Sequence, residues 1–423
     1  MPEPHRLLMV AYHFPPLAGS SGVQRTLRLA QQLPEFGWEP MVLSTREFAY
    51  ERTSEDMVGE VPAGLRVRRA MALDTARHLA IAGRHLAALA IPDRWASWRW
   101  DGVRVGMQMI RRHRPSALWS TFPIATAHVI GAELQRRSGL PWVADFRDPM
   151  VQPAHPYQPE VRQRHRLIEA EVLRHASLAL FTTAGAAADC VARHPGQGDR
   201  IGTLENGYDE AAFALAEQRA ATRPRPPAAP AVLLHSGIVY PDERDPRSLF
   251  AALRLLHDEG SVRPGSFVLR LRAAVHESEI RALAHAEGVE DYVELAPPIG
   301  YVDALAEMLT VDALLLLQAG NCNQQVPAKL YEYLRAGRPI LALTDAAGDT
   351  ALALRAAGVS RLAALDSVAA IAALLRHHLA TGGPDLRPTR QAVAQASRRA
   401  RAQELARRLD TLVPPTHGTE KAR

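Results

Sequence analysis

The sequence predicts an α/β protein made of two doubly wound, Rossmann-like halves. Short apolar runs alternate with helical apolar patterns along most of the chain, which is the spacing of βαβ units in a parallel sheet. A proline-dense stretch over 223–230 separates two such series and is typical of an extended connector. The length of 423 residues exceeds one ordinary core, so roughly two domains are expected.

In the first series, apolar runs predict buried strands over 7–11, 40–44, 65–69, 117–121, 141–144 and 178–182. Helices are predicted over 23–33, 124–138, 161–175 and 184–193. An Ala- and His-rich helix is also predicted in the eighties, and a separate basic helix is predicted to end at Arg114. Because strands and helices alternate, the strands should lie parallel, with helices on both faces of the sheet.

The second series predicts strands over 231–236, 267–271, 292–295, 313–317 and 340–343, a helix over 247–258 and a final helix over 389–412. We therefore expect an N-terminal domain over 1–205, a linker or hinge over 206–230, a C-terminal domain over 231–385, and a helix and tail over 386–423 that packs back on the first domain. Two such halves place a ligand cleft between them, at the carboxyl ends of both sheets.

The composition is that of a soluble globular protein, with 47% hydrophobic and 22% charged residues. Neither a secretory leader nor a transmembrane span is expected. Two cysteines, Cys190 and Cys322, suit a reducing cytosol and exclude a disulfide framework. The net charge of +5 permits anionic ligands, but no aromatic-basic motif indicates nucleic acid.

The stretch 326–339 contains the strongest candidate site. A helix is predicted here between two apolar runs, and Gly337 should end it. Lys329 and Glu332 are three residues apart, so both lie on one face near the helix N-terminus. Helix N-termini favour anions and a lysine adds a point charge, so the pair suits a ligand with phosphate and hydroxyl groups. The alternative is an ordinary ion pair on a solvated helix face.

The composition makes this lysine stand out. Lysine and arginine together number 50, and only Lys329 and Lys421 are lysines. Arginine is therefore the ordinary surface cation of this chain, and a lysine within a motif calls for a specific reason.

Two further motifs follow predicted strands of the first series. Gly19-Ser-Ser-Gly22 lies between a strand and a helix, where backbone amides can hold a phosphate, although it also fits a tight turn without a ligand. Asp145 and Asp148 follow the strand over 141–144 and suit a general base or a group that orients a hydroxyl. Their alternative role is a local ion cluster with Arg147 that shapes the loop.

Together these motifs resemble a known family. Phe14-Pro-Pro with Gly19-x-x-Gly22, Asp145 to Pro149, Asn206 to Asp209, and Pro327 to Pro339 occur in this order and spacing along essentially the whole chain. They resemble the GT-B glycosyltransferases, and the last motif resembles the retaining family 4. The resemblance implies two Rossmann-like domains facing a central cleft, the first on the acceptor side and the second binding the nucleotide sugar. It also implies retaining transfer of a sugar from a nucleoside diphosphate sugar to a glycan, lipid-linked or small-molecule acceptor.

The resemblance also implies roles for individual residues. Glu332 would bind the donor ribose and Lys329 the diphosphate, and Gln324 stands near the sugar, where the family often has a glutamate. Arg244 would be the basic residue that follows Gly237 after the first strand, or else a member of a local ion pair with its acidic neighbours. The remaining donor-binding candidates are Gly19, Gly22, Leu330, and Ile299 and Tyr301 where the base is usually seated. Asp145, Asp148, Lys329 and Arg244 are the catalytic candidates.

No metal or other cofactor is expected beyond the nucleotide sugar itself. Metal-dependent glycosyltransferases hold the ion with an Asp-x-Asp motif, and the sequence has none. Arg244, Lys329 and the amides at 19–22 would receive the negative charge of the departing diphosphate instead. No clustered His/Cys pattern indicates a metal site.

A surface that binds a lipid-linked acceptor is predicted in the segment before residue 105. Trp95, Trp98 and Trp100, with Arg94, Arg99 and Arg104 beside an amphipathic helix at 78–91, suit a lipid-facing patch, or else ordinary helix packing. We expect a cytoplasmic protein, peripheral to the inner face of the membrane if the patch forms. The alternative functions are a GT-B nucleotide-sugar epimerase and a catalytically inactive nucleotide-sugar-binding protein, the latter because of Gln324.

Overall fold

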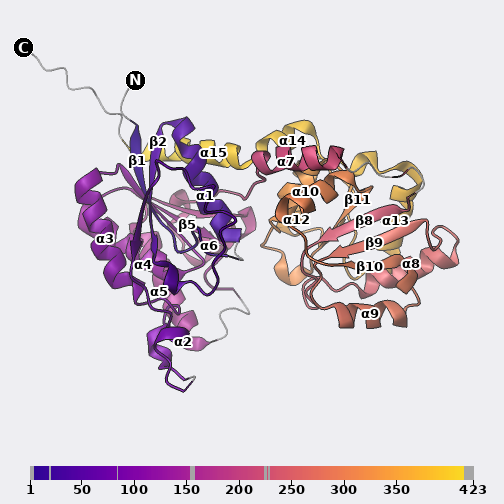
Figure 1. The fold of residues 1–423 in the computed structure, drawn as a ribbon, viewed down its shortest axis with the longest axis horizontal. Helices are drawn as coiled ribbons and strands as arrows, with labels where there is room; N and C mark the ends of the chain where they lie inside the picture. The colour runs from indigo at the N-terminus through magenta and orange to yellow at the C-terminus, as the bar shows by residue number, and fades with distance from the viewer. Residues whose placement is uncertain are drawn as a thin grey trace, which may run out of the picture. The chain divides into compact units, whose positions relative to one another are not determined.

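The computed structural model describes residues 4–18, 21–82, 84–152, 158–222, 226 and 229–413. The chain forms two compact units, each with its own parallel sheet (Figure 1). The N-terminal unit contains residues 1–205 and 398–423, and the C-terminal unit contains residues 206–397. The chain therefore crosses between the units twice.

The N-terminal unit contains a seven-stranded parallel sheet in the order β3-β2-β1-β4-β5-β6-β7. Its strands are β1 (His5–Val10), β2 (Trp38–Thr45), β3 (Arg66–Ala70), β4 (Ala117–Thr121), β5 (Trp142–Arg147), β6 (Leu178–Phe181) and β7 (Ile201–Thr203). Its α-helices are α1 (Ser21–Gln32), α2 (Thr75–His78), α3 (Trp98–His113), α4 (Ala125–Ser138), α5 (Pro159–His175), α6 (Ala184–Arg193) and α15 (Arg398–Leu412). Short 3₁₀ turns are η1 (Leu33–Phe36), η2 (Glu47–Ala49), η3 (Ala87–Ala90) and η4 (Gly198–Arg200).

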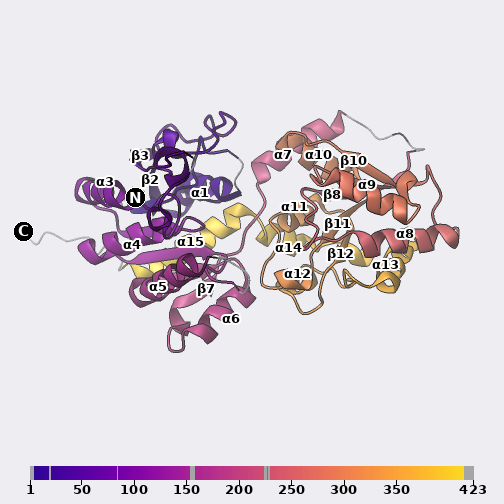
Figure 2. The ribbon, with the colours of Figure 1, turned by 90° about the horizontal axis from the view of Figure 1, so that it is seen from below.

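Both faces of this sheet are covered, because alternate strand residues enter different cores. Leu8 and Val10 pack with α3, α4, α5 and α6 on one face. Leu7 and Met9 pack with α1 and α15 on the other (Figure 2). The strands are therefore apolar almost throughout, which is why the sequence shows them as continuous runs rather than alternating ones.

The C-terminal unit contains a five-stranded parallel sheet in the order β10-β9-β8-β11-β12. Its strands are β8 (Ala231–Ser236), β9 (Phe267–Arg272), β10 (Val293–Ala296), β11 (Ala313–Leu317) and β12 (Ile340–Leu343). Its helices are α7 (Glu210–Ala221), α8 (Arg247–Asp258), α9 (Glu277–Ala286), α10 (Tyr301–Thr310), α11 (Lys329–Ala336), α12 (Asp349–Ala356), α13 (Val368–Thr381) and α14 (Arg390–Gln395), with 3₁₀ turns η5 (Glu290–Tyr292), η6 (Gly320–Cys322) and η7 (Pro384–Leu386). Helices α8, α9 and α13 cover one face, and α7, α10, α11 and α12 cover the other.

The structure differs from the sequence-based prediction in the eighties, where no long helix forms. Helix α2 ends at His78, and Ile81 and Arg84 form an isolated antiparallel bridge. The side chains of this segment are mostly exposed. An isolated amphipathic helix is marginal in water without a surface to pack on, so the apolar spacing alone did not produce one.

The expected linker over 206–230 differs as well. Helix α7 occupies much of it, and Phe213 of this helix is fully buried in the core of the C-terminal unit. The segment 206–222 is thus part of that unit, and the chain crosses at 205/206 instead. The final predicted helix is divided into α14 and α15 at the second crossing, near Ser397.

Helix α15 completes a face of the N-terminal unit although it comes last in the chain. Leu405 and Leu409 are fully buried beside α1, and the indole nitrogen of Trp38 donates a hydrogen bond to Asp410 at 2.8 Å. All six tryptophans precede residue 143, so tryptophan fluorescence reports on this unit alone.

We expect Leu405→Ala to lower the unfolding free energy of the N-terminal unit by about 2–5 kcal/mol, because it leaves a cavity in a closed core. Tryptophan fluorescence during urea unfolding measures the change. Arg407→Ala, at an exposed position of the same helix, should change stability by less than about 0.5 kcal/mol. Equal stability of the two variants would show that α15 does not stabilise this sheet.

Candidate functional site

A glycine turn follows the central strand of the C-terminal sheet. Strand β8 ends at Ser236, and Gly237 adopts a φ of +113°. A Cβ atom at this position would lie 3.0 Å from the ammonium nitrogen of Lys329. Both the backbone conformation and the close approach of the lysine therefore require glycine here.

Lys329 is held by a buried histidine. His235 Nδ1 donates to the carbonyl of Leu315 at 3.0 Å, so its Nε2 carries the lone pair and accepts from Lys329 Nζ, also at 3.0 Å. Burial, and secondarily the charge of Lys329, hold the pKa of His235 well below its ordinary value. The neutral imidazole thus positions the ammonium without cancelling its charge.

Among the described residues, no carboxylate forms an ion pair with the Lys329 ammonium. Burial, and then the nearby charge of Arg244, lower the pKa of Lys329 to about 7, and the carboxylate of Glu332 opposes this shift. Lys329 is the first residue of α11, where the positive end of the helix dipole favours negative charge. The arrangement is therefore prepared for an anion, and a bound phosphate would restore the ordinary lysine pKa.

Arg244 lies close to the Lys329 ammonium. It does not form the ion pair with its acidic neighbours that was the alternative interpretation. Its guanidinium donates to the carbonyl of Ile238 and stacks over the ring of Tyr240, with 5.0 Å between the guanidinium carbon and the ring centre. Asp245 pairs with Arg247 instead. Within the described part of the chain no carboxylate forms an ion pair with Arg244, so the local ion-pair alternative is wrong and its charge stays available to a ligand.

Glu332 is hydrogen-bonded to the segment 299–301, which was predicted to bind the nucleotide base. The hydroxyl of Tyr301, at the start of α10, donates to Glu332 Oε1 at 2.9 Å. Ile299 and Tyr301 are 40% and 38% exposed, which is unusual for large apolar or aromatic side chains and leaves their surfaces open. Glu332 and these two side chains thus form one continuous region beside Lys329.

The loop after β11 presents Gln324. Gln318 is buried and holds the loop by donating to the carbonyls of Cys322 and Gln325, at 2.7 and 2.9 Å. Gln324 itself is exposed. Leu330, in contrast, has its side chain fully buried in the core, and its role in donor binding stays a prediction.

Sequence reasoning missed two residues of this region. In the sequence, His235 is a single polar residue near the end of an apolar strand. Tyr333 occupies a position of α11 that fits its apolar pattern. In the structure, the hydroxyl of Tyr333 accepts a hydrogen bond from the backbone amide of Ser236 at 3.0 Å, fixing the glycine turn. The position of His235, two residues before the turn glycine, was the only available signal.

In the N-terminal unit, Asp145 has a structural environment. Its carboxylate is fully buried and accepts two hydrogen bonds from Arg25, at 2.9 and 2.7 Å, and one from Thr121 at 2.9 Å. Arg25 also donates to the carbonyls of Leu204 and Glu205. The expectation that Asp145 acts on an acceptor is therefore wrong, because its oxygens are enclosed and paired, and its partner is Arg25 rather than Arg147.

Asp148 and the first turn of α1 lie in a more open environment. A Cβ atom at Gly22 would come within 2.4 Å of His13 Nδ1 and 2.7 Å of Arg147 Nη1, so the glycine admits both side chains. Burial, with a smaller effect of Arg147, lowers the pKa of His13 to about 3. Asp148 is half-buried and accepts a weak bond from Thr182 at 3.4 Å. Gly19 lies outside the described residues.

The predicted tryptophan patch does not form as one surface. Trp98 is fully buried, Trp95 donates to the carbonyl of Ala49 at 3.1 Å, and only Trp100 is exposed, by 75%. Arg94 pairs with the buried Asp74, and Arg104 pairs with Asp101 in its own helix. In the described residues no helix is both long and apolar enough to cross a membrane.

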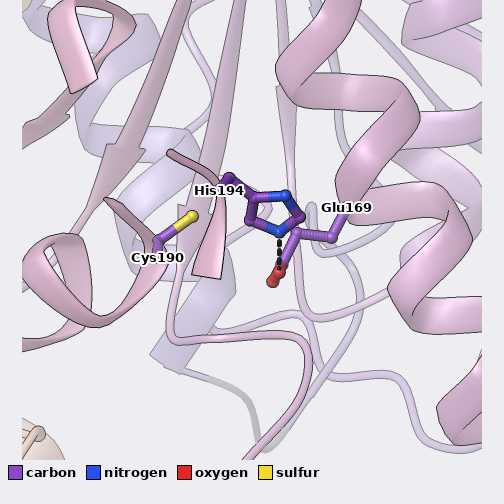
Figure 3. A group of neighbouring side chains, drawn as sticks. All are labelled: Glu169, Cys190 and His194. Atoms are coloured by element: carbon purple, nitrogen blue, oxygen red, sulfur yellow. Dashed lines mark hydrogen bonds and ion pairs between the residues drawn. The ribbon is translucent and has the colours of Figure 1, made fainter. Parts of the chain in front are cut away.

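The fold also brings together Glu169, Cys190 and His194, which the sequence did not suggest as a cluster (Figure 3). His194 Nε2 lies 2.9 Å from Glu169 Oε1, and Arg193 pairs with the same carboxylate. Burial, and then the charge of Glu169, raise the pKa of the Cys190 thiol to about 12. A protonated thiol and a carboxylate already neutralised by arginine do not suit a metal ion, so the group stabilises the packing of α5 on α6.

Comparisons with known proteins agree with this architecture. Residues 21–207 match the family model of the glycosyl transferase 4-like domain. A sucrose-phosphate synthase from Thermosynechococcus elongatus aligns with a TM-score of 0.63 at 14% identity, covering 96% of this chain and 99% of that one. HepE from Anabaena, in complex with UDP and glucose, aligns with a TM-score of 0.62 at 15% identity, covering 96% and 100%.

A third solved structure has the same fold. An α,α-trehalose 6-phosphate synthase from Burkholderia multivorans aligns with a TM-score of 0.63 at 11% identity, covering 96% of this chain and 97% of that one. No curated protein sequence matches the chain. The predicted GT-B fold class is therefore confirmed, and the resemblance to glycosyltransferases of the family 4 type is confirmed over residues 21–207.

We expect Asp145→Asn to lower the unfolding free energy of the N-terminal unit by about 3–5 kcal/mol, because it leaves the buried Arg25 charge uncompensated. Asp148→Asn should stay within about 0.5 kcal/mol of the wild type. Urea unfolding followed by tryptophan fluorescence compares them. If Asp145→Asn were as stable as Asp148→Asn, the buried pair would not stabilise this unit.

The lysine gives a pH-dependent prediction. Its pKa is about 7 in the folded chain against an ordinary 10.5. Between these values the unfolded chain holds a proton that the folded chain lacks, so this group makes stability rise with pH. Lys329→Met should therefore raise the melting temperature most at about pH 6 and progressively less toward about pH 9. Calorimetry measures this, and a pH-independent difference would contradict the lowered pKa.

Proposed function

We propose that this chain, which has the GT-B fold and whose residues 21–207 match the glycosyl transferase 4-like domain, transfers a sugar from a nucleoside diphosphate sugar to an acceptor hydroxyl with retention at the anomeric carbon. The observation that carries the proposal is the Lys329 ammonium at the start of α11, placed against the Gly237 turn by neutral His235. A half-buried cation of this kind suits a diphosphate.

The proposed donor site stabilises the leaving group. As the bond between the anomeric carbon and the phosphate oxygen breaks, negative charge develops on the diphosphate. Lys329, Arg244 and the positive end of the α11 dipole supply preorganised positive charge to receive it. Because His235 is neutral, it does not offset the charge of the ammonium, and a bound diphosphate favours the protonated form of Lys329.

The remaining donor contacts follow from the same region. Glu332, held by Tyr301, accepts hydrogen bonds from ribose hydroxyls, and the exposed Ile299 and Tyr301 pack against the base. Gln324 hydrogen-bonds the sugar through its amide. The complex of HepE with UDP and glucose supports a uridine nucleotide as the first donor to test.

On the acceptor side we propose Asp148 as the carboxylate that orients the acceptor hydroxyl, since Asp145 is enclosed. The new bond forms on the face that the phosphate leaves, and a phosphate oxygen takes the acceptor proton. This balances the reaction without an enzymatic nucleophile. The acceptor is a glycan or a lipid-linked or small molecule, and the reaction takes place in the cytoplasm.

No metal step is included in this scheme, because Lys329 and Arg244 take the place of a cation at the diphosphate. Gln324 favours one other function, binding of a nucleotide sugar without turnover. Measured donor turnover separates the two.

We expect UDP or another nucleoside diphosphate to bind with an affinity that EDTA changes by less than about twofold. Lys329→Ala should lower donor turnover by about ten- to a hundredfold, because it removes a charge-assisted contact that strengthens as the diphosphate leaves. Glu332→Gln should mainly weaken nucleotide binding, since ribose contacts change little during the reaction. Titration calorimetry and donor hydrolysis measure both quantities.

The exposed Arg263, before β9, provides the control, and Arg263→Ala should behave as the wild type. Slow hydrolysis of the donor should first release sugar with the same anomeric configuration as the donor. NMR measures this configuration. Wild-type behaviour of Lys329→Ala, or activity that EDTA abolishes and manganese restores, would overturn the proposed site. Binding without any turnover would favour the inactive binding protein.

A further inference from the structure

One segment of the N-terminal unit is closed at its base and exposed beyond it. We call residues 75–82 and 84–92 the apolar loop. Arg94 donates two hydrogen bonds to the buried carboxylate of Asp74, at 3.0 and 2.6 Å. The amide and hydroxyl of Thr75 both donate to the carbonyl of Arg94 at 2.9 Å. The two ends of the loop are therefore fixed to each other and to the unit.

Beyond this base, large aliphatic side chains face solvent. Ile81 is 85% exposed and Leu86 is 72% exposed, with Leu79 and Leu89 at 37% and 46%. Ile81 and Arg84 exchange two backbone hydrogen bonds, at 2.8 and 3.0 Å, which fold the chain back at the outer end. Figure 1 shows this part around α2 at the lower end of the N-terminal unit, away from the sheet. Single exposed leucines are ordinary, but four within eleven residues are a binding surface.

The charges of the loop have one sign. Its ionisable side chains are Arg77, His78, Arg84 and His85, and it has no carboxylate. The carboxylates closest in sequence are occupied: Asp74 by Arg94, and Asp93 by the backbone amides of Thr126 and Trp95. An apolar surface accompanied only by basic groups is complementary to an anionic one.

Lipid fits this combination better than a folded partner. A convex outer end with aliphatic side chains enters the boundary between headgroups and acyl chains, while arginines remain among anionic headgroups. The exposed Trp100, with Arg99 over its ring, lies in the first turn of α3. This turn is next to the segment that enters the loop, since Ser97 bonds both the amide and the carbonyl of Leu73. Tryptophan is enriched at that boundary.

We infer that the apolar loop binds the N-terminal unit to the surface of an anionic bilayer. Ile81 and Leu86 enter the acyl boundary and Arg84 contacts the headgroups. The membrane docking is inferred from the loop alone. Its consequence, that the acceptor is lipid-linked, rests on the proposed function. The surface overlaps the segment 78–91 that the sequence placed beside the expected tryptophan patch, and of the three tryptophans of that patch only Trp100 is exposed.

The experiment is vesicle flotation of the full chain. Phosphatidylcholine vesicles with about one third phosphatidylglycerol should carry the wild type, and pure phosphatidylcholine should carry roughly tenfold less. The double variant Ile81→Ser, Leu86→Ser should lose at least about tenfold of the binding to anionic vesicles. Arg84→Glu should weaken only the anionic-lipid preference.

The matched control is Leu215→Ser, Leu352→Ser, which changes two leucines that are each 52% exposed in the C-terminal unit. It should bind vesicles within about twofold of the wild type. Loss in the control equal to that in the loop variant, or equal binding of the wild type to both vesicle types, would overturn the inference. A wild-type dimer by light scattering that the loop variant abolishes would also overturn it, in favour of a second copy of the chain.

Nucleoside diphosphate binding is measured on the same proteins and should be identical in all of them. If vesicle binding fails while the nucleotide binds, only the docking surface is wrong. If vesicles bind and no nucleotide does, only the proposed function is wrong.

Discussion

The hydrogen bond between Lys329 and His235 sets the requirements for the whole donor region. For the ammonium to stay in place, the histidine must be neutral, which its bond to the Leu315 carbonyl and its burial ensure. The position after β8 must lack a side chain, which Gly237 provides. The turn must hold its shape, which the bond from the Ser236 amide to Tyr333 provides. Two neighbouring strands and one helix therefore converge on a single charge.

A second buried charge organises the N-terminal unit in the opposite way. Arg25 of α1 is fully used by Asp145 at the end of β5 and by the carbonyls at 204 and 205. This pair joins a helix, a strand and the point where the chain leaves the unit. Lys329 contacts a neutral histidine, whereas Arg25 is paired with a carboxylate. The proposed ligand site and the structural site thus differ in the partner that the fold supplies.

The sequence predicted the strands well because parallel strands buried on both faces are continuous apolar runs. It did not predict β7, since three residues are too few to show a pattern. It placed a helix in the eighties from spacing alone, because spacing carries no information about whether a surface exists to cover it. It found Lys329 and Glu332 because they share one helix, but not Arg25, which lies 120 positions from Asp145. Glu169 and Cys190 were likewise invisible as neighbours, because the fold alone brings α5 and α6 together.

The late position of α15 affects the order in which the protein can be made. The C-terminal unit is inserted between residue 205 and the last helix of the N-terminal unit. During synthesis the first sheet emerges without α15 on one of its faces. The core around Leu7 and Met9 is completed by Leu405 and Leu409 only when translation is almost finished. The nascent chain therefore carries an uncovered apolar surface while the whole second unit is being added, which is when chaperones bind such surfaces. A ribosome that stops before residue 398 releases a chain with a complete C-terminal unit and an N-terminal unit without its closing helix.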